Sequence, residues 1–107
     1  MDEKTVENAM QIIMFAGDAR DFCKKALDKV SEEKFEEAEE LFKKADEEIT
    51  KAHHIQTDCI QGAIAGEEME YNVLFSHAQD TLMTIYSEIG LAKKIFALYR
   101  RIDERLK

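Results

Sequence analysis

Apolar residues recur every three or four positions over three long stretches of this chain, and no proline interrupts them. This spacing matches the 3.6-residue period of an α-helix that buries one face. The stretches predict a first helix over about 4–30, a second that ends near Gly62 and a third that reaches Leu106. Short links between long helices favour neighbours in opposite directions, so the expected fold is all-α, an antiparallel three-helix bundle.

The links between the helices are less sharply marked. Ser31, Glu32 and Glu33 predict a break and a new helix start, with the Ser31 hydroxyl as its cap and acids in its first turn. Residues 62–71 hold two glycines and three acids, which predicts the longest loop. Asn72 would then cap the third helix.

A length of 107 residues with 45% hydrophobic residues predicts one folded domain, residues 1–107. Several apolar side chains lie off the helical stripes, and together they exceed what one three-helix core consumes. This surplus favours self-association, although a groove for a partner's helix would give the same pattern. The residues are Met10, Ile12, Met14, Phe15, Met69 and Met83.

The formal charge of -8 argues against binding to nucleic acid or to anionic lipid surfaces. No apolar run approaches the roughly 20 residues that span a bilayer, and no secretory signal is recognisable, so a cytoplasmic location is expected. Cys23 and Cys59 occupy apolar helical positions without metal-ligand spacing. They are expected to be buried free thiols.

Polar groups gather at the start of the third helix. His77, Asp80, Thr81 and Thr84 are separated by three, four and seven positions and therefore share one helix face. A neutral imidazole is nucleophilic near pH 7 and can carry a phosphoryl group. The alternative for any single histidine is a structural role, with its nitrogens satisfied by hydrogen bonds.

His53 and His54 have a different arrangement. Because they are consecutive on a helix, their side chains point about 100° apart and cannot chelate one metal ion from one face. Each is expected to be a surface or subunit-contact residue.

The run His77-Ala78-Gln79-Asp80, followed by Leu82-Met83-Thr84, resembles the signature of the lactose/cellobiose-type IIA proteins of the phosphoenolpyruvate-dependent sugar phosphotransferase system. Two further segments resemble the same family in order and separation: Ala16–Arg20, and Ala52–Thr57 followed by Gly66-Glu67. The resemblance covers nearly the whole chain.

The resemblance implies a homotrimer in which HPr phosphorylates His77 and His77 passes the phosphoryl group to a cysteine of a IIB component. The membrane IIC component takes part only indirectly. The aspartate matching Asp80 would bind a divalent metal such as Mg²⁺ at the trimer axis together with its two symmetry mates. The transported sugar would be a β-disaccharide, closer to cellobiose or chitobiose than to lactose.

Thr81 departs from the family, which commonly carries a second histidine there. A threonine hydroxyl would then help to position the phosphoryl group, with Ser76 and Gln79 as further donors and Gln56 as a possible supporting residue. No lysine or arginine is close to His77 in sequence. HPr is one expected source of positive charge, and an adjacent subunit that brings Arg20 or another basic residue is the other.

Two other functions compete with the phosphoryl carrier. Residues 35–45 resemble one helix of tetratricopeptide or microtubule-interacting modules, which would suit a noncatalytic helical adaptor. This resemblance has no second copy at a repeat period and leaves the polar cluster unexplained. A metal-dependent hydrolase would need Glu-x-x-His ligands on several helices, and the sequence lacks them.

Overall fold

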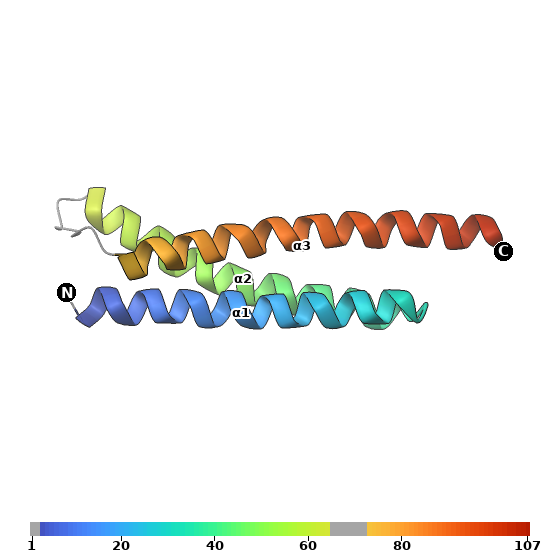
Figure 1. The fold of residues 1–107 in the computed structure, drawn as a ribbon, viewed down its shortest axis with the longest axis horizontal. Helices are drawn as coiled ribbons and strands as arrows, with labels where there is room; N and C mark the ends of the chain where they lie inside the picture. The colour runs from blue at the N-terminus through green and yellow to red at the C-terminus, as the bar shows by residue number, and fades with distance from the viewer. Residues whose placement is uncertain (1–2, 65–72) are drawn as a thin grey trace.

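A computed structural model describes residues 3–64 and 73–107, which form three long helices and no strand. They are α1 (Glu3–Ser31), α2 (Phe35–Ile64) and α3 (Val73–Leu106). Figure 1 shows α1 and α3 running in the same direction and α2 running in the opposite direction. The predicted all-α three-helix bundle is confirmed.

The buried residues of each helix alternate by steps of three and four, which is the spacing of coiled-coil packing. In α1 they run from Ala9 to Val30, in α2 from Ala38 to Ala52 and in α3 from Phe75 to Ala92. Many of these positions are alanine, which lets helix backbones approach closely. The fully buried residues with the largest side chains are Ile12, Leu82 and Ile85.

Ile12 was expected to lie partly off the core, and this prediction is wrong. Its side chain is completely buried, because it continues the alternation between Ala9 and Ala16. Met10, Met14 and Met83 are half exposed, as predicted. Met69 and the proposed cap Asn72 lie outside the described residues.

The turn from α1 to α2 is built differently from the prediction. Ser31 is the last residue of α1, and its hydroxyl donates to Asp28 O at 2.7 Å instead of capping α2. Glu33 adopts the left-handed conformation, with φ of 61°. Glu33 N donates to Val30 O at 3.0 Å and Lys34 N to Lys29 O at 2.9 Å, the two bonds of a Schellman motif.

The bundle is elongated, 59 × 19 × 18 Å, and it is not equally tight throughout. α1 packs along both other helices, whereas α2 and α3 contact each other far less. α3 also extends past the turn that joins α1 and α2 (Figure 1). Beyond Ala92 no residue of α3 is fully buried, so one of its faces remains open.

Candidate functional site

His77 lies in the second turn of α3, with its side chain exposed. Its neighbour Ala78 is completely buried and fixes the rotation of the helix at this point. Because successive residues are about 100° apart, burial of Ala78 directs His77 to the surface. An exposed imidazole is accessible to a second protein, as a group that exchanges phosphoryl groups requires.

Thr81 lies one turn after His77, and the two residues interact. The Thr81 hydroxyl donates to His77 O at 2.8 Å, and the side chain is half-buried. The predicted clustering of these two residues is therefore present, although the hydroxyl is bonded to the backbone rather than to the imidazole.

The other predicted site residues are distributed around α3 and α2. Asp80 is exposed and shares the His77 side of α3, whereas half-buried Gln79 points to another side of the helix. Gln56 is half-buried on α2, one turn beyond the contact of His53 with Tyr86. This register places Gln56 about 9 Å along the bundle from the level of His77.

Arg20 is already engaged within its own chain. Its guanidinium makes a bidentate pair with Glu88, Nε to Oε1 and Nη2 to Oε2, both at 2.9 Å. Glu88 lies about 16 Å along α3 from His77, since each residue adds 1.5 Å. Within one chain Arg20 is thus remote from His77, and its expected role from an adjacent subunit stays a prediction. The sequence offered no signal for its pairing with Glu88.

Within residues 3–64 and 73–107, no group of three or more His, Cys, Asp or Glu side chains could hold a metal ion. Asp80 supplies one exposed carboxylate. A magnesium site built on Asp80 would therefore need ligands beyond the described residues of this one chain.

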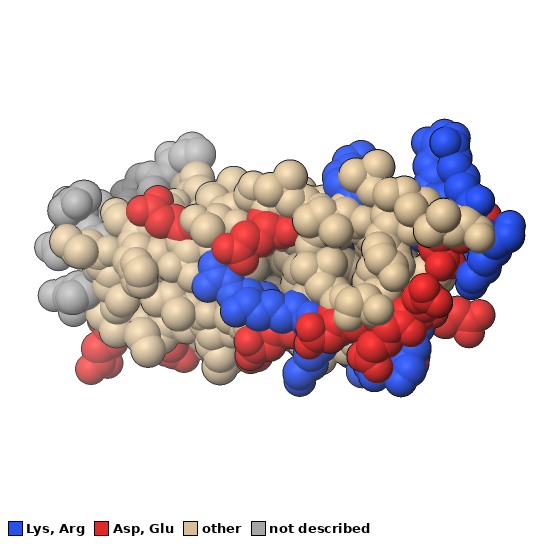
Figure 2. Space-filling model, turned by 45° about the vertical axis from the view of Figure 1, so that its right-hand side comes forward, with Lys and Arg blue, Asp and Glu red and all other residues tan. Residues whose placement is uncertain are grey.

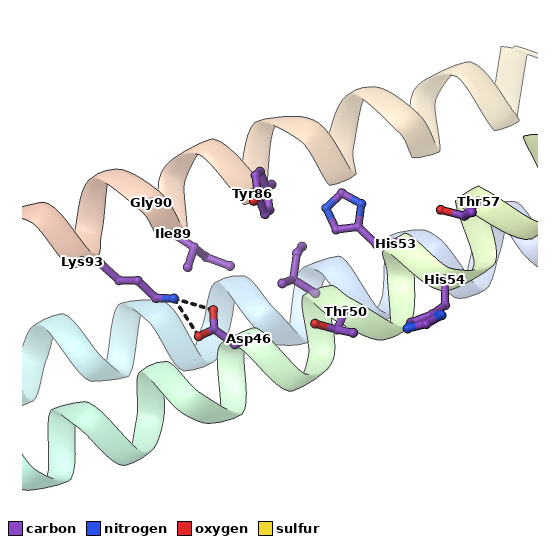
Figure 3. Close-up of a pocket in the computed structure, with 10 residues that line it drawn as sticks. Asp46, Thr50, His53, His54, Thr57, Tyr86, Ile89, Gly90 and Lys93 are labelled. Atoms are coloured by element: carbon purple, nitrogen blue, oxygen red, sulfur yellow. Dashed lines mark hydrogen bonds and ion pairs between the residues drawn. The ribbon is translucent and has the colours of Figure 1, made fainter.

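A groove of about 710 Å³ separates α2 from α3 (Figure 3). Ile49 and Ile89 are buried beneath it, and the pair of Asp46 with Lys93 closes one end, with 2.7 Å from Nζ to either carboxylate oxygen. This groove is separate from His77. Tyr86, on its wall, is nine positions from His77 and so points about 180° away around α3.

His53 projects from α2 into this groove (Figure 3). Its ring meets the ring of Tyr86 edge-on, with centroids 4.9 Å apart. Its Nε2 is buried and has no hydrogen-bond partner among the described residues. Buried polar atoms are rarely unpaired, so this nitrogen stands out among the described side chains. Sequence spacing gave no signal for it, because the groove arises from the separation of two helices.

The cysteines differ from each other more than expected. Cys23 is buried, whereas Cys59 is half-buried and accepts a hydrogen bond from Asn8 Nδ2 at 3.3 Å. Burial raises the pKa of each thiol, so both remain protonated near neutrality. Both are free, as predicted, but Cys59 is not fully buried.

Charge is unevenly spread along the bundle. On the face drawn in Figure 2, basic and acidic side chains crowd the end where α3 terminates, and far fewer lie toward the end where α1 and α3 begin. His77 belongs to this second end. None of the helices, as far as they are described, is long and apolar enough to cross a membrane.

The chain is similar to known proteins over most of its length. The family model for the lactose/cellobiose-specific IIA subunit of the phosphotransferase system matches residues 7–100. The lichenan-specific IIA component of Bacillus subtilis is 36% identical over 105 residues, covering 98% of this chain and 96% of that protein. The cellobiose-specific IIA component of Lactococcus lactis is 32% identical, and the match covers 88% of this chain and 81% of that protein.

Solved structures give the same result. The crystal structure of the cellobiose-specific enzyme IIA from Bacillus anthracis superposes with a TM-score of 0.91 at 38% identity, covering 97% of this chain and 95% of that one. The similarity thus extends over the three helices and the segment that carries His77. The chain belongs to the lactose/cellobiose-specific IIA family of the sugar phosphotransferase system.

Proposed function

We propose that this chain is a phosphoryl carrier that accepts its group on His77 from phospho-HPr and donates it to a cysteine of a IIB component. The exposed position of His77 on α3, in a chain of this family, is the observation that carries the proposal. The carrier works in the cytoplasm, with the membrane IIC component as an indirect partner.

Each transfer exchanges one bond to phosphorus for another. The lone pair of the His77 imidazole attacks phosphorus, and the N–P bond of phospho-HPr breaks with its electron pair returning to the HPr nitrogen. In the second transfer a IIB thiolate attacks, an S–P bond forms, and the pair of the N–P bond returns to His77. An exposed imidazole suits both transfers, because HPr and the IIB component must each reach the same nitrogen.

The sugar class is taken from the family rather than from the site. Relatives named for lichenan, lactose and cellobiose are 36%, 36% and 32% identical to this chain, which separates them little. The proposed cargo is therefore a β-disaccharide of the cellobiose, chitobiose or lactose type.

We further propose that the carrier is a homotrimer. Four exposed apolar residues of α3 follow one another by steps of four, three and four, the spacing of a coiled-coil seam, and they are Leu91, Ile95, Leu98 and Ile102. A monomer gains nothing from this seam.

The trimer would bring its Asp80 carboxylates together, since Asp80 lies on the same side of α3 as Leu91 and Leu98. These oxygens suit Mg²⁺, which would neutralise the repulsion between them. Asp80 would act in assembly, close to His77 along the helix, while the imidazole itself carries the phosphoryl group.

The test is the mass of the intact protein after incubation with phosphoenolpyruvate, enzyme I and HPr. Wild type should gain one acid-labile phosphoryl group, His77→Ala should gain none, and His54→Ala, which removes another exposed histidine, should behave as wild type. Absence of an adduct on folded wild type, with partners shown to be active on another IIA protein, would contradict the carrier role and favour the helical adaptor.

A further inference from the structure

The apolar seam of α3 has one flank that its own chain leaves uncovered. In a coiled coil, the positions beside the seam carry the charges that pair neighbouring helices. On one flank, Ala92 is buried in its own bundle and Tyr99 contacts the ring of Phe35. On the other flank, Lys94 and Arg101 each precede a seam residue, are exposed and make no ion pair among the described residues. This open flank can meet another chain.

Met83 continues the open flank toward the start of α3. It lies eleven positions, about three turns, before Lys94 and is therefore on the same side of the helix. Its side chain is 50% exposed. The open flank thus offers an apolar contact near the start of α3 and two positive charges further along.

The outer face of α1 carries groups that match this flank. Met14, Asp21 and Asp28 follow one another by seven positions, so they share one side of the helix. All three are exposed, and neither aspartate makes an ion pair among the residues that the structure describes. Arg20 points toward α3, and Lys24 and Asp28 are turned about 40° and 80° further out. Asp28 is therefore the outermost charge on this side.

The two surfaces also match in height along the bundle. The bidentate ion pair between α1 and α3 joins residues 68 positions apart, and these helices run in the same direction (Figure 1). Met14 therefore lies within one residue of the height of Met83. Asp28 lies within two residues of the height of Lys94, which is about 3 Å.

Within one chain, α1 lies on the other side of the seam from the open flank. Glu88, which contacts α1, is turned about 50° from the seam in one direction, and Lys94 about 70° in the other. Chains in a closed ring meet through unlike faces, so one side of each chain contacts the opposite side of the next. The open flank of one chain would then meet α1 of the adjoining chain.

We infer that the outer face of α1 packs against the open flank of α3 in a second copy of this chain. Met14 contacts Met83, and Asp28 faces Lys94. This inference rests on the proposed trimer, and it names the surfaces that join its chains beside the seam. A single exposed ion pair contributes little, but a ring of three chains repeats the contact three times.

The first test exchanges the charges and measures the trimer dissociation constant by sedimentation equilibrium. Lys94→Glu and Asp28→Lys should each raise it about tenfold or more, because like charges then face each other at every contact. The double variant should recover most of this loss. Lys44→Glu is the matched control, since Lys44 lies over the Phe22 ring on the α1–α2 side of the bundle, and it should stay within about twofold of wild type. Circular dichroism checks that all variants remain helical.

The second test addresses the apolar contact. With oxidised glutathione, a protein that combines Met14→Cys with Met83→Cys should form disulfides between chains and run as a covalent trimer on a non-reducing gel. Neither single variant should do so.

A trimeric wild type whose exchanged charges give no recovery, or whose cysteine pair forms no cross-link, overturns this contact and leaves the trimer intact. A monomeric wild type overturns the trimer, and the inference with it. Neither result bears on the carrier role, which has its own test in phosphorylation of His77.

Discussion

Leu82 and Met83 are consecutive residues of α3 with opposite surroundings, fully buried and 50% exposed respectively. Leu82→Ala removes buried methyl groups and leaves a cavity, so the free energy of unfolding should fall by about 2–5 kcal/mol. Met83→Ala is the control and should change it by less than about 0.5 kcal/mol. Urea denaturation at one fixed chain concentration measures both, and equal losses would contradict the assigned core.

Cys23 makes stability depend on pH in the alkaline range. Because burial raises the pKa of its thiol, the folded chain keeps the proton to a higher pH than the unfolded chain does. The resulting stability is complete below the unfolded pKa of about 8.5 and is lost as pH rises through the folded pKa. The free energy of unfolding should decline above about pH 8.5, and less steeply in Cys23→Ala. Parallel pH profiles of the two proteins would show that Cys23 is not the cause.

At the scale of single residues, part of the candidate site could be predicted from the sequence. Burial of Ala78 and exposure of His77 follow from the apolar spacing of α3, and so does the shared face of His77 and Thr81. The partner of the Thr81 hydroxyl did not follow, because the same residue could have donated to the backbone, to the imidazole or to water.

At the scale of single elements, the end of α1 carries a residue unsuited to its conformation. Glu33 has a positive φ in a position where helix ends favour glycine. Glu33→Gly should therefore raise the free energy of unfolding by about 1 kcal/mol. Glu32→Gly, in the same turn without a positive φ, should lower it by up to about 1 kcal/mol. Thermal and urea unfolding would decide, and a destabilised Glu33→Gly would contradict this account of the turn.

The three helices predicted from the sequence are confirmed, but the predicted structure of this junction is wrong. Ser31 looks like a helix cap because serine hydroxyls often bond to free backbone N–H groups. The structure instead ends α1 with a Schellman motif, whose signal is usually a glycine and is here replaced by Glu33. The serine cap and the Schellman motif have local chemistry in common, so the sequence at this junction did not distinguish between them.

For the whole molecule, the proposed trimer can be tested at the exposed seam of α3. Leu98→Glu places a charge in the middle of this seam and should reduce the trimer to smaller species in sedimentation velocity. Ala97→Glu adds the same charge on another side of α3, where Ala97 is also exposed, and should leave the trimer intact. A wild-type monomer would contradict the trimer, and a trimeric Leu98→Glu would contradict the seam.

Magnesium should act on stability only through the assembled carboxylates. Added Mg²⁺ should raise the melting temperature of wild type above that in EDTA by several degrees, because it relieves repulsion between Asp80 side chains. Asp80→Asn should show no such rise and should melt above wild type in EDTA, whereas Asp18→Asn, on an exposed part of α1, should respond as wild type. An equal magnesium effect in Asp80→Asn would exclude Asp80 as the ligand.

The sequence by itself determined the number of helices, their direction and the residues of most of the core, because helical periodicity is a local property that survives in any bundle. It also determined the family through the residues around His77. Only the tertiary structure decided which long-range pairs form, since the contacts of Arg20 with Glu88 and of Asp46 with Lys93 depend on helix register. The groove between α2 and α3, with its unpaired His53 nitrogen, also depends on the tertiary structure. It exists because α2 and α3 each pack more closely against α1 than against each other.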